Sequence, residues 1–465
     1  MFVSRRKFIG ATGMALARPK FVWAEDRAEG FPTLRARKVQ AQLLQSPANK
    51  TDTWQFSDDG KISVVRATQG EEFSVKIINE LEREIWLHWF GVRGPSDVMT
   101  LNIQPGVDNA VDCTFTPPDA GTFWFGPLTD ASRLRDMGLY GMLVVEEKVP
   151  GPALFDMPLI IDDWKLGDDG KIDDSFGNLE AAVGTGRLGN WFTVNGRYRP
   201  HLKLPADKAC RLRILNAANV RPMMLQFKGV DPLLVSLDGQ PISPRHSGDQ
   251  GLSLAPGQRL DLVIDAGAES FSMALDLFED IVEICSVDRE GSAAASTLPD
   301  NFSLLPNPIS SGLDMAKAKT VSVVISGGAK GGLKSATYQG QVLDIRALLE
   351  KGIAWAINDA AGPGSSPIGT FAIGDTVVFE IDNKTNFEQP LHIHGHVWQV
   401  IENEGTALEN QPWKDTAVVA PLKKQKLAFV ADNSGLWVVQ SLVAERVDSG
   451  LLASFTVQAT PPATP

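Results

Sequence analysis

Histidine is rare in this sequence, and its placement gives the first indication of chemistry. His88 stands alone in an apolar run, whereas His392 and His394 lie close together near the end of the chain. Two or three imidazoles, completed by water, are a suitable ligand set for one Cu(II) or Zn(II) ion. The alternative is that all three are neutral core histidines, bonded to backbone groups where two domains meet. His201 and His246 fit neither group and are expected to be ordinary surface or core residues.

The segments that position these histidines belong to an internal repeat. Three segments begin at a tryptophan, continue through a glycine-containing loop and an alternating apolar strand, and end at an asparagine. They span residues 54–79, 191–216 and 355–383, which are separations of 25, 25 and 28 residues. Alternation with period two predicts half-buried strands, and repetition of so long a unit predicts successive β domains.

The repeat places histidines at equivalent points of two domains. His88 lies nine residues after Asn79, and His392 lies nine residues after Asn383. The middle segment has Leu225 at that point, nine residues after its own asparagine. We therefore expect one site that is shared by the first and third domains.

Composition sets the expected domain boundaries. Breaks rich in Pro, Gly, Ser and Ala divide the chain, and its Pro-rich end is expected to be disordered. The expected division is a leader and linker at residues 1–34, domains at residues 35–150, 151–305 and 306–458, and a tail at residues 459–465.

Charge and hydropathy exclude two classes of partner. The formal net charge is -12 and the chain has no basic stripe, so a nucleic acid is not expected. No run reaches 18 apolar residues, so no membrane span is expected. The acidic stretch at residues 162–174 lacks the pattern of a calcium loop and is interpreted as a solvated loop. The three cysteines are either buried thiols or one disulfide with an odd thiol: Cys113, Cys210 and Cys285.

The first residues carry an export signal. Residues 4–10 read Ser-Arg-Arg-Lys-Phe-Ile-Gly, which resembles a twin-arginine signal, and an apolar run follows, with cleavage expected after Ala24. Twin-arginine transport carries folded proteins, so we expect a folded protein in the periplasm.

Four further segments carry a family resemblance. Residues 88–91 read His-Trp-Phe-Gly where multicopper oxidases have His-Trp-His-Gly, and residues 389–395 read Gln-Pro-Leu-His-Ile-His-Gly where they have His-Pro-x-His-x-His-Gly. The strand at residues 121–125 is followed by Gly-Pro-Leu in place of His-x-His, and residues 435–451 keep the family's Gly and Trp frame without its ligands. On these motifs, residues 50–458 resemble a three-domain multicopper oxidase. The resemblance implies an all-β fold of three cupredoxin-like Greek-key β-barrel domains.

The resemblance also implies that most copper ligands are lost. The family holds its blue copper through a Cys, two His and usually a Met, and those positions are here Ser441, Gln389, Arg446 and Leu451. Of the eight histidines that hold the family's trinuclear cluster, three remain, namely His88, His392 and His394. The other five positions hold Phe90, Gly126, Leu128, Gln440 and Leu442.

These losses lead to two functional hypotheses. Without the Cys there is no entry for electrons, so we expect no oxidase activity, no catalytic residue and no cofactor, or at most one copper ion. The family includes a copper-free, twin-arginine-exported branch that supports the bacterial division machinery. Resemblance to that branch implies a periplasmic scaffold with a protein partner, in the divisome or in envelope stress. The alternative hypothesis is a mononuclear copper-binding protein or oxidoreductase that uses His88, His392 and His394.

Overall fold

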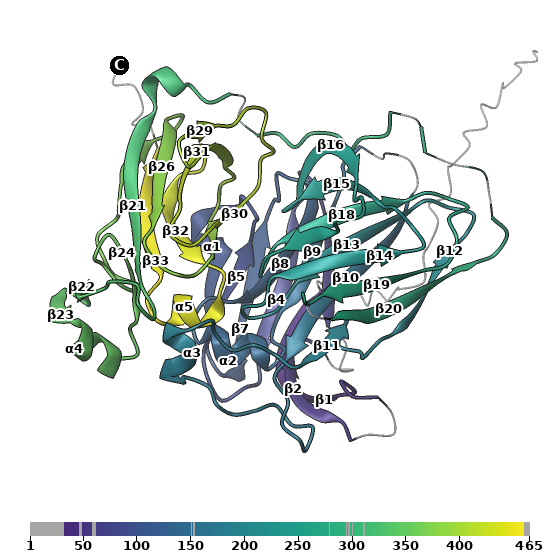
Figure 1. Ribbon diagram of the computed structural model, residues 1–465, viewed down its shortest axis with the longest axis horizontal. Coiled ribbons are helices and arrows are strands. Elements are labelled where there is room, and N and C mark those ends of the chain that lie inside the picture. Colours follow the sequence, from purple (N-terminus) through teal and green to yellow (C-terminus); the bar gives the residue numbers. More distant parts are fainter. Residues whose placement is uncertain are drawn as a thin grey trace, which may run out of the picture.

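A computed structural model describes residues 32–459, apart from residues 46–48, 58–61, 150, 152–153, 279, 294, 296–297, 300 and 310–311. Strands dominate it and form three consecutive pairs of sheets, which we call the first, second and third units (Figure 1). The predicted all-β class is therefore confirmed. The expected export signal and the end of the tail lie outside the described residues, and the domain boundaries at residues 150 and 305 stay predictions.

The first unit pairs a sheet of order β2-β1-β4-β7 with a sheet of order β3-β9-β8-β5-β6. Its strands are β1 (Thr33–Ala41), β2 (Thr51–Gln55), β3 (Ser63–Thr68), β4 (Phe73–Asn79), β5 (Ile85–Phe90), β6 (Thr100–Ile103), β7 (Gly106–Phe115), β8 (Gly121–Pro127) and β9 (Gly141–Glu146).

The second unit pairs sheets of order β11-β10-β13-β18-β15-β16 and β12-β20-β19-β14-β17. Its strands are β10 (Phe155–Trp164), β11 (Trp191–Val194), β12 (His201–Pro205), β13 (Cys210–Asn216), β14 (Met223–Lys228), β15 (Leu233–Leu237), β16 (Gln240–His246), β17 (Leu252–Leu254), β18 (Arg259–Ile264), β19 (Phe271–Asp276) and β20 (Ile281–Glu290).

The third unit pairs sheets of order β24-β21-β26-β31-β28-β29 and β25-β33-β32-β27-β30, and the hairpin β22-β23 projects from it with α4 (Figure 1). Its strands are β21 (Lys319–Gly327), β22 (Ser335–Tyr338), β23 (Gln341–Asp344), β24 (Trp355–Ile357), β25 (Thr370–Ala372), β26 (Thr376–Asn383), β27 (Gln389–Ile393), β28 (Gln399–Asn403), β29 (Thr406–Ala407), β30 (Thr416–Val419), β31 (Lys424–Val430), β32 (Gly435–Ser441) and β33 (Leu452–Gln458).

Helices are short and serve as connections between strands. In the described part of the chain they are α1 (Ser96–Met99), α2 (Ala131–Asp136), α3 (Leu179–Val183), α4 (Ile345–Glu350), α5 (Ala444–Asp448) and a 3-10 turn at Met315–Lys317. None of them is long and apolar enough to cross a bilayer. One helix from each unit, α2, α3 and α5, gathers where the three units meet (Figure 1).

The asparagine that ends each repeat has the same structural task in every unit. Asn79, Asn216 and Asn383 are fully buried at the ends of β4, β13 and β26. Each side chain accepts a hydrogen bond from the backbone N–H two residues further on, at 3.0 Å in all three cases. Each also donates to a backbone carbonyl four or five residues further on, at 2.7, 2.8 and 2.8 Å. The amide thus replaces the bonds that the backbone loses when the strand turns away.

The units differ in how their cores are joined. One continuous apolar cluster runs through the first and third units, whereas the second unit has an apolar cluster of its own. Figure 1 shows the third unit (green to yellow) at the left of the view and the second unit (teal) at the right. The strands β5 and β27, which carry His88 and His392, approach each other where the first and third units meet.

Candidate metal centre and the positions around it

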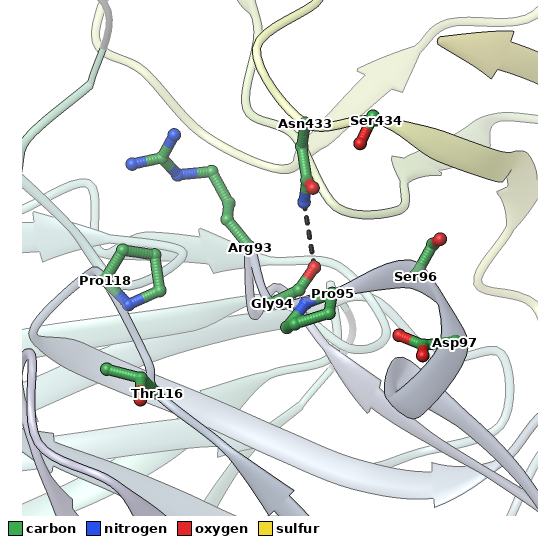
Figure 2. Close-up of a pocket in the computed structure, with 9 residues that line it drawn as sticks. All are labelled: Arg93, Gly94, Pro95, Ser96, Asp97, Thr116, Pro118, Asn433 and Ser434. Atoms are coloured by element: carbon green, nitrogen blue, oxygen red, sulfur yellow. Dashed lines mark hydrogen bonds between the residues drawn. The ribbon is translucent and has the colours of Figure 1, made fainter. Parts of the chain in front are cut away.

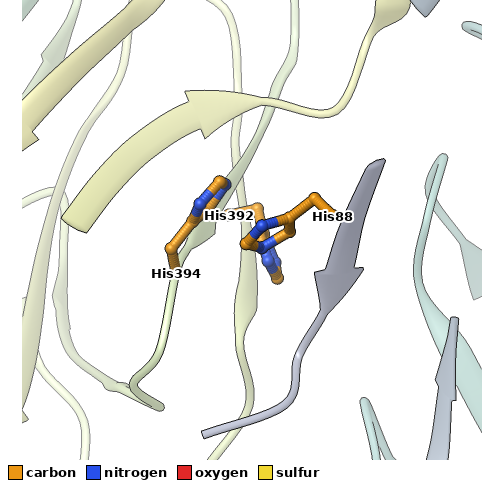
Figure 3. A group of neighbouring side chains, drawn as sticks. All are labelled: His88, His392 and His394. Atoms are coloured by element: carbon orange, nitrogen blue, oxygen red, sulfur yellow. The ribbon is translucent and has the colours of Figure 1, made fainter. Parts of the chain in front are cut away.

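His88, His392 and His394 come together at the interface between the first and third units (Figure 3). His88 lies on β5, His392 lies on β27, and His394 follows directly after β27. One ring nitrogen from each residue can be chosen so that the three nitrogens lie within 4.8 Å of one another, and all three side chains are buried. The three histidines therefore converge between the first and third units, as the repeat predicts. That they hold a metal stays a prediction.

Polar neighbours fix the rings of two of these histidines. His88 Nδ1 lies 2.7 Å from Thr100 Oγ1. His392 Nδ1 lies 3.1 Å from Thr416 Oγ1 and 3.2 Å from Asp415 Oδ1. An imidazole that is held at Nδ1 by a carboxylate or hydroxyl presents Nε2 to a metal, which is how most metal-binding histidines are oriented.

The free nitrogens face a closed interior. The Nε2 atoms of His392 and His394 have no hydrogen-bond partner among the residues that the structure describes. The rings of His88 and His394 stack with centroids 3.9 Å apart. Burial lowers the pKa of His88 well below its usual value, and the neighbouring His392 adds to the effect. Burial likewise lowers the pKa of His394, His88 and His392 add to the fall, and the neighbouring side-chain amide of Gln440 opposes it. Both rings are therefore neutral near pH 7, which is the protonation state that binds metals.

The second unit supports this group through a buried ion pair. Arg259, on β18, pairs with Asp415, which in turn contacts His392. Burial alone would raise the pKa of Asp415, but Arg259 and His392 outweigh it and hold that pKa below its usual value. Gly91 lies against the pair with φ of +84°, and a Cβ there would collide with both Asp415 and Arg259. Glycine is therefore required at this point of close approach.

Aromatic and aliphatic side chains occupy the space beside the histidines. Phe90 stacks on Trp124 with ring centroids 3.8 Å apart and an interplanar angle of 5°. Leu442 is buried in the same apolar cluster, and Leu128 packs against it. The guanidinium of Arg135 lies 5.0 Å from the Trp124 ring and donates to the Leu442 carbonyl at 2.9 Å. Three positions where the resemblance expects cluster histidines thus contribute apolar packing.

The four positions where the resemblance expects blue copper also lie together. Arg446 Nη1 donates to Gln389 Oε1 at 2.9 Å, and the backbone N–H of Ser441 donates to the carbonyl of Leu451 at 3.2 Å. Each of the four is at most 4% exposed. A guanidinium, an amide, a hydroxyl and an aliphatic chain do not form a copper-binding donor set, because copper at such a site needs a thiolate and imidazoles.

Arg446 is held firmly in this position. Its Nη1 also donates to the carbonyl of Glu388 at 2.5 Å. The guanidinium lies 5.1 Å from the ring of Trp355 and 5.2 Å from the ring of Phe387. Burial lowers the pKa of Arg446 to about 10, although Glu445 and Glu388 oppose the change, so the side chain stays charged at neutral pH. A fixed positive charge therefore occupies the place of the expected copper.

Other predictions have mixed outcomes. All three cysteines are free, buried thiols, so the alternative of a disulfide is not supported. The solvated loop predicted from residue 162 is wrong at its beginning, because Asp162 and Asp163 lie buried on β10 and Tyr140 donates to Asp162. Burial raises the pKa of Asp162 to about 7, and Asp163 adds to the rise. Asp448, in α5, accepts hydrogen bonds from the backbone N–H groups of Ala131 and Ser132 at 2.9 and 2.8 Å.

The sequence reasoning missed the polar residues that support the site. Arg259, Asp415 and Arg135 carry no local motif, since their partners lie in other units of the chain. Gln440 was noted only as a lost ligand, yet neither of its amide atoms has a hydrogen-bond partner in the described part of the chain. Its position in the family's last ligand segment was the signal that could have marked it as a residue facing the histidines.

An open groove of about 440 Å³ lies elsewhere on the seam between the first and third units (Figure 2). Its walls come from the loop after β5, which carries Arg93 and Ser96, and from the loop that carries Asn433 and Ser434. Asn433 Nδ2 donates across the groove to the carbonyl of Gly94 at 2.9 Å. Polar and apolar groups line the groove in similar measure, and none of the three histidines lines it, so it has no part in the metal centre.

Comparisons with known proteins find family models and solved structures that are similar to this chain. Two family models described as multicopper oxidase match residues 38–150 and 339–461, which together make just over half of the chain. The structure of a multicopper oxidase from Pseudomonas thermotolerans matches 92% of this chain and 99% of its own, with a TM-score of 0.79 and 26% identity. One from Pseudomonas parafulva matches with a TM-score of 0.76 and 28% identity. The predicted three-barrel cupredoxin-like fold is thereby confirmed.

Curated relatives divide into two kinds. Multicopper oxidase MmcO of Mycobacterium tuberculosis is 25% identical over 94% of this chain and 93% of its own. Cell division protein FtsP of Xenorhabdus nematophila is 25% identical over 98% of this chain and 99% of its own. FtsP of Escherichia coli is 28% identical over 57% of this chain and 60% of its own. The chain is thus similar over nearly its whole length both to an oxidase and to a cell division protein.

Proposed function

Because the chain belongs to the multicopper oxidase family, we propose that it is an exported member that has lost oxidase chemistry and acts as a periplasmic scaffold in cell division. The observation that carries this proposal is the contact between Arg446 and Gln389 at the blue-copper position. Arg446 donates to Gln389, and Gln389 Nε2 donates to Thr385 Oγ1 at 3.2 Å, so protein groups occupy the position as a packed part of the fold.

Electrostatics argues against copper beside Arg446. A doubly charged ion about 4 Å from the guanidinium would be repelled by about 8 kcal/mol at an effective dielectric of about 20. With a pKa of about 10, Arg446 does not lose its proton at neutral pH to relieve that repulsion. The neighbouring Ser441 offers only a hydroxyl, which stays protonated at that pH and binds copper poorly.

Electron transfer from this position would also lack a route. In the family, the residues on either side of the copper-binding Cys pass electrons to the cluster, and here they are Gln440 and Leu442. Leu442 is packed among aromatic and aliphatic side chains. The reduction of dioxygen needs several coppers acting together, and three histidines cannot hold them.

The proposed role in division rests on the relatives named FtsP. One of them aligns with almost the whole of this chain and almost the whole of itself, so the two share the complete three-unit body. Loss of the ligands with retention of the fold is what a scaffold requires, because its surface must persist while its chemistry need not. The partner that fits this role is a protein of the divisome.

Export is the remaining part of the proposal. The paired Arg5 and Arg6 before an apolar run support transport by the twin-arginine pathway, and they lie outside the described residues. A folded three-unit body is a suitable cargo for that pathway, so we place the protein in the periplasm.

Complementation of a gene deletion tests this function. We expect the deletion to cause filamentous cells under envelope stress, and the wild-type gene to restore division. The double variant Arg5→Lys/Arg6→Lys should fail to restore it, whereas the matched control Arg18→Lys should succeed. Normal division of the deletion strain under osmotic and detergent stress would overturn the proposed role.

A second candidate function is supported by one observation, the convergence of His88, His392 and His394. Three imidazoles in one buried group can hold a single Cu(II) or Zn(II) ion. This candidate is compatible with a scaffold, because a single ion without an electron route would not restore oxidase activity. Metal analysis of the purified chain and of a His88→Ala/His392→Ala variant tests it, and equal metal contents would reject it.

A further inference from the structure

Gln440 is a buried side chain whose polar atoms are not matched by the protein around it. It is 0% exposed on β32, and neither Oε1 nor Nε2 has a hydrogen-bond partner among the described residues. Buried side-chain amides in folded proteins are almost always bonded to protein or to an ordered ligand. An unmatched amide becomes an indication of a ligand where other unpartnered ligand atoms lie beside it.

Gln440 shares this condition with two histidines beside it. It lies directly opposite His392 on the neighbouring antiparallel strand, so both side chains leave the sheet on the same face. His394 follows two residues after His392, and its N–H donates to the carbonyl of Val438 at 2.9 Å, which continues the pairing with β32. The Gln440 amide lies near enough to His394 to oppose the lowering of its pKa, although the two form no hydrogen bond of normal geometry, so the polar atoms of these three residues face one region.

The fourth member of the group comes from the other unit. His88 projects from β5, and a nitrogen of its ring lies within 4.8 Å of the chosen nitrogens of His392 and His394 (Figure 3). The wall next to them is apolar, since the ring of Phe90 lies 5.6 Å from that of His392 and stacks on Trp124. Such a wall offers no hydrogen bond to a metal-bound water or to a substrate.

The donors and the apolar wall together suit a structural site. Structural metal sites are closed by four protein ligands, whereas catalytic ones keep a position open for water or substrate. Building on the metal-binding candidate above, we propose that Gln440 Oε1 is the fourth donor, with His88, His392 and His394, of a closed site for one Zn(II) or Cu(II) ion.

The ion would act as a clasp between units. It would join β5 of the first unit to β27 and β32 of the third. Metal–nitrogen distances of about 2.0–2.1 Å place tetrahedral ligand atoms about 3.3 Å apart. The three histidine nitrogens lie up to 4.8 Å apart without the ion, so binding of the ion would draw the three imidazole rings closer together. Asp415, behind His392, balances part of the added charge.

Titration of the metal-free, full-length chain tests the role of Gln440. Zinc sulfate and copper sulfate are titrated separately by calorimetry, and the metal content of the product is measured. We expect one ion per chain, and a loss of affinity of at least about 10-fold in Gln440→Leu, as for other groups that support a metal. The matched control is Gln55→Leu, because Gln55 is 1% exposed and its amide is also unpartnered in the described residues, but it lies on β2.

Hydrogen exchange tests the clasp itself. We expect amide exchange in β5, β27 and β32 to slow when the ion is added, and circular dichroism establishes that each variant is folded. Affinity in Gln440→Leu within twofold of the parent would overturn the role of Gln440, and unchanged exchange in the loaded chain would overturn the clasp. If the parent binds neither ion, this inference and the metal-binding candidate fail together, while the complementation assay still decides the scaffold function.

Discussion

The pairing of Arg446 with Gln389 makes a quantitative prediction about stability. The perturbation is a double-mutant cycle of Arg446→Leu, Gln389→Leu and the double variant, each of which keeps an aliphatic chain in the buried space. Arg446 donates to Gln389 Oε1 at 2.9 Å and to the carbonyl of Glu388 at 2.5 Å, and it packs between two aromatic rings. Its removal leaves both acceptors buried without that donor.

The magnitude follows from these contacts. A hydrogen bond to a charged group contributes about 1.5–3 kcal/mol, and a cation over an aromatic ring contributes about 0.5–2 kcal/mol. Relief from burying the charge offsets part of the loss, so we expect Arg446→Leu to destabilise the third unit by about 2–4 kcal/mol. The coupling energy between Arg446 and Gln389 should be about 1.5–3 kcal/mol, because the double variant leaves no unpaired acceptor on residue 389.

Differential scanning calorimetry of the four proteins measures this cycle through the transition of the joined core of the first and third units. The surface control is Arg346→Leu, whose side chain is 90% exposed and pairs only with Glu350 one turn away. It should change the stability by no more than about 0.5 kcal/mol. A coupling energy below about 0.5 kcal/mol would show that Arg446 and Gln389 do not interact, and would refute the assignment of this pair to the former copper position.

Three further outcomes are expected. Phe90→Ala should destabilise the chain by about 3–5 kcal/mol in thermal unfolding, because it opens a cavity beneath Trp124; a cost below about 1 kcal/mol would contradict the packing. The stability contributed by Asp162 should fall by about 1 kcal/mol as pH rises from about 6.3 to 8, because its folded-state pKa is raised to about 7 and the proton that it holds is lost in that window. Buried histidines, such as His396 with its pKa lowered by burial to about 4, oppose this fall in the same window, so it is measured as the difference between the parent and Asp162→Asn in thermal unfolding, and an equal pH dependence of the two proteins would refute the assignment. Burial raises the pKa of the Cys113 and Cys210 thiols to about 11 and that of the Cys285 thiol to about 12. Ellman's reagent at pH 8 should therefore label none of the three before the chain unfolds, and rapid labelling of the native chain would contradict their burial.

The repeat and its strands could be predicted because their physical causes are local. Alternation with period two, tight turns and a terminal asparagine that bonds its own loop all act within about 30 residues, and the three asparagines repeat the same contacts. The meeting of His88 with His392 followed from the same register, since equivalent points of similar units can face each other. The convergence of His88, His392 and His394 at one site could therefore be predicted from the sequence.

The polar support of the site could not be predicted in this way. Arg259 and Asp415 are 156 residues apart and pair only because the second unit packs against the third. Asp162 looked like part of an acidic loop, yet it is buried on β10 beside Tyr140, which no nearby residue indicates. Such contacts depend on how whole units dock, and a single sequence does not encode them as a local pattern.

Spectroscopy of the copper-loaded chain tests the central claim most directly. The purified mature protein is incubated with copper under oxidising conditions, freed of loose ions, and examined for visible absorption and for oxygen uptake with a phenol or a ferrous salt. Since Ser441 and Arg446 occupy the positions of the thiolate and an imidazole, we expect neither an intense thiolate-to-copper charge-transfer band nor oxygen consumption above that of free copper. An intense blue colour together with turnover of either donor would contradict the account.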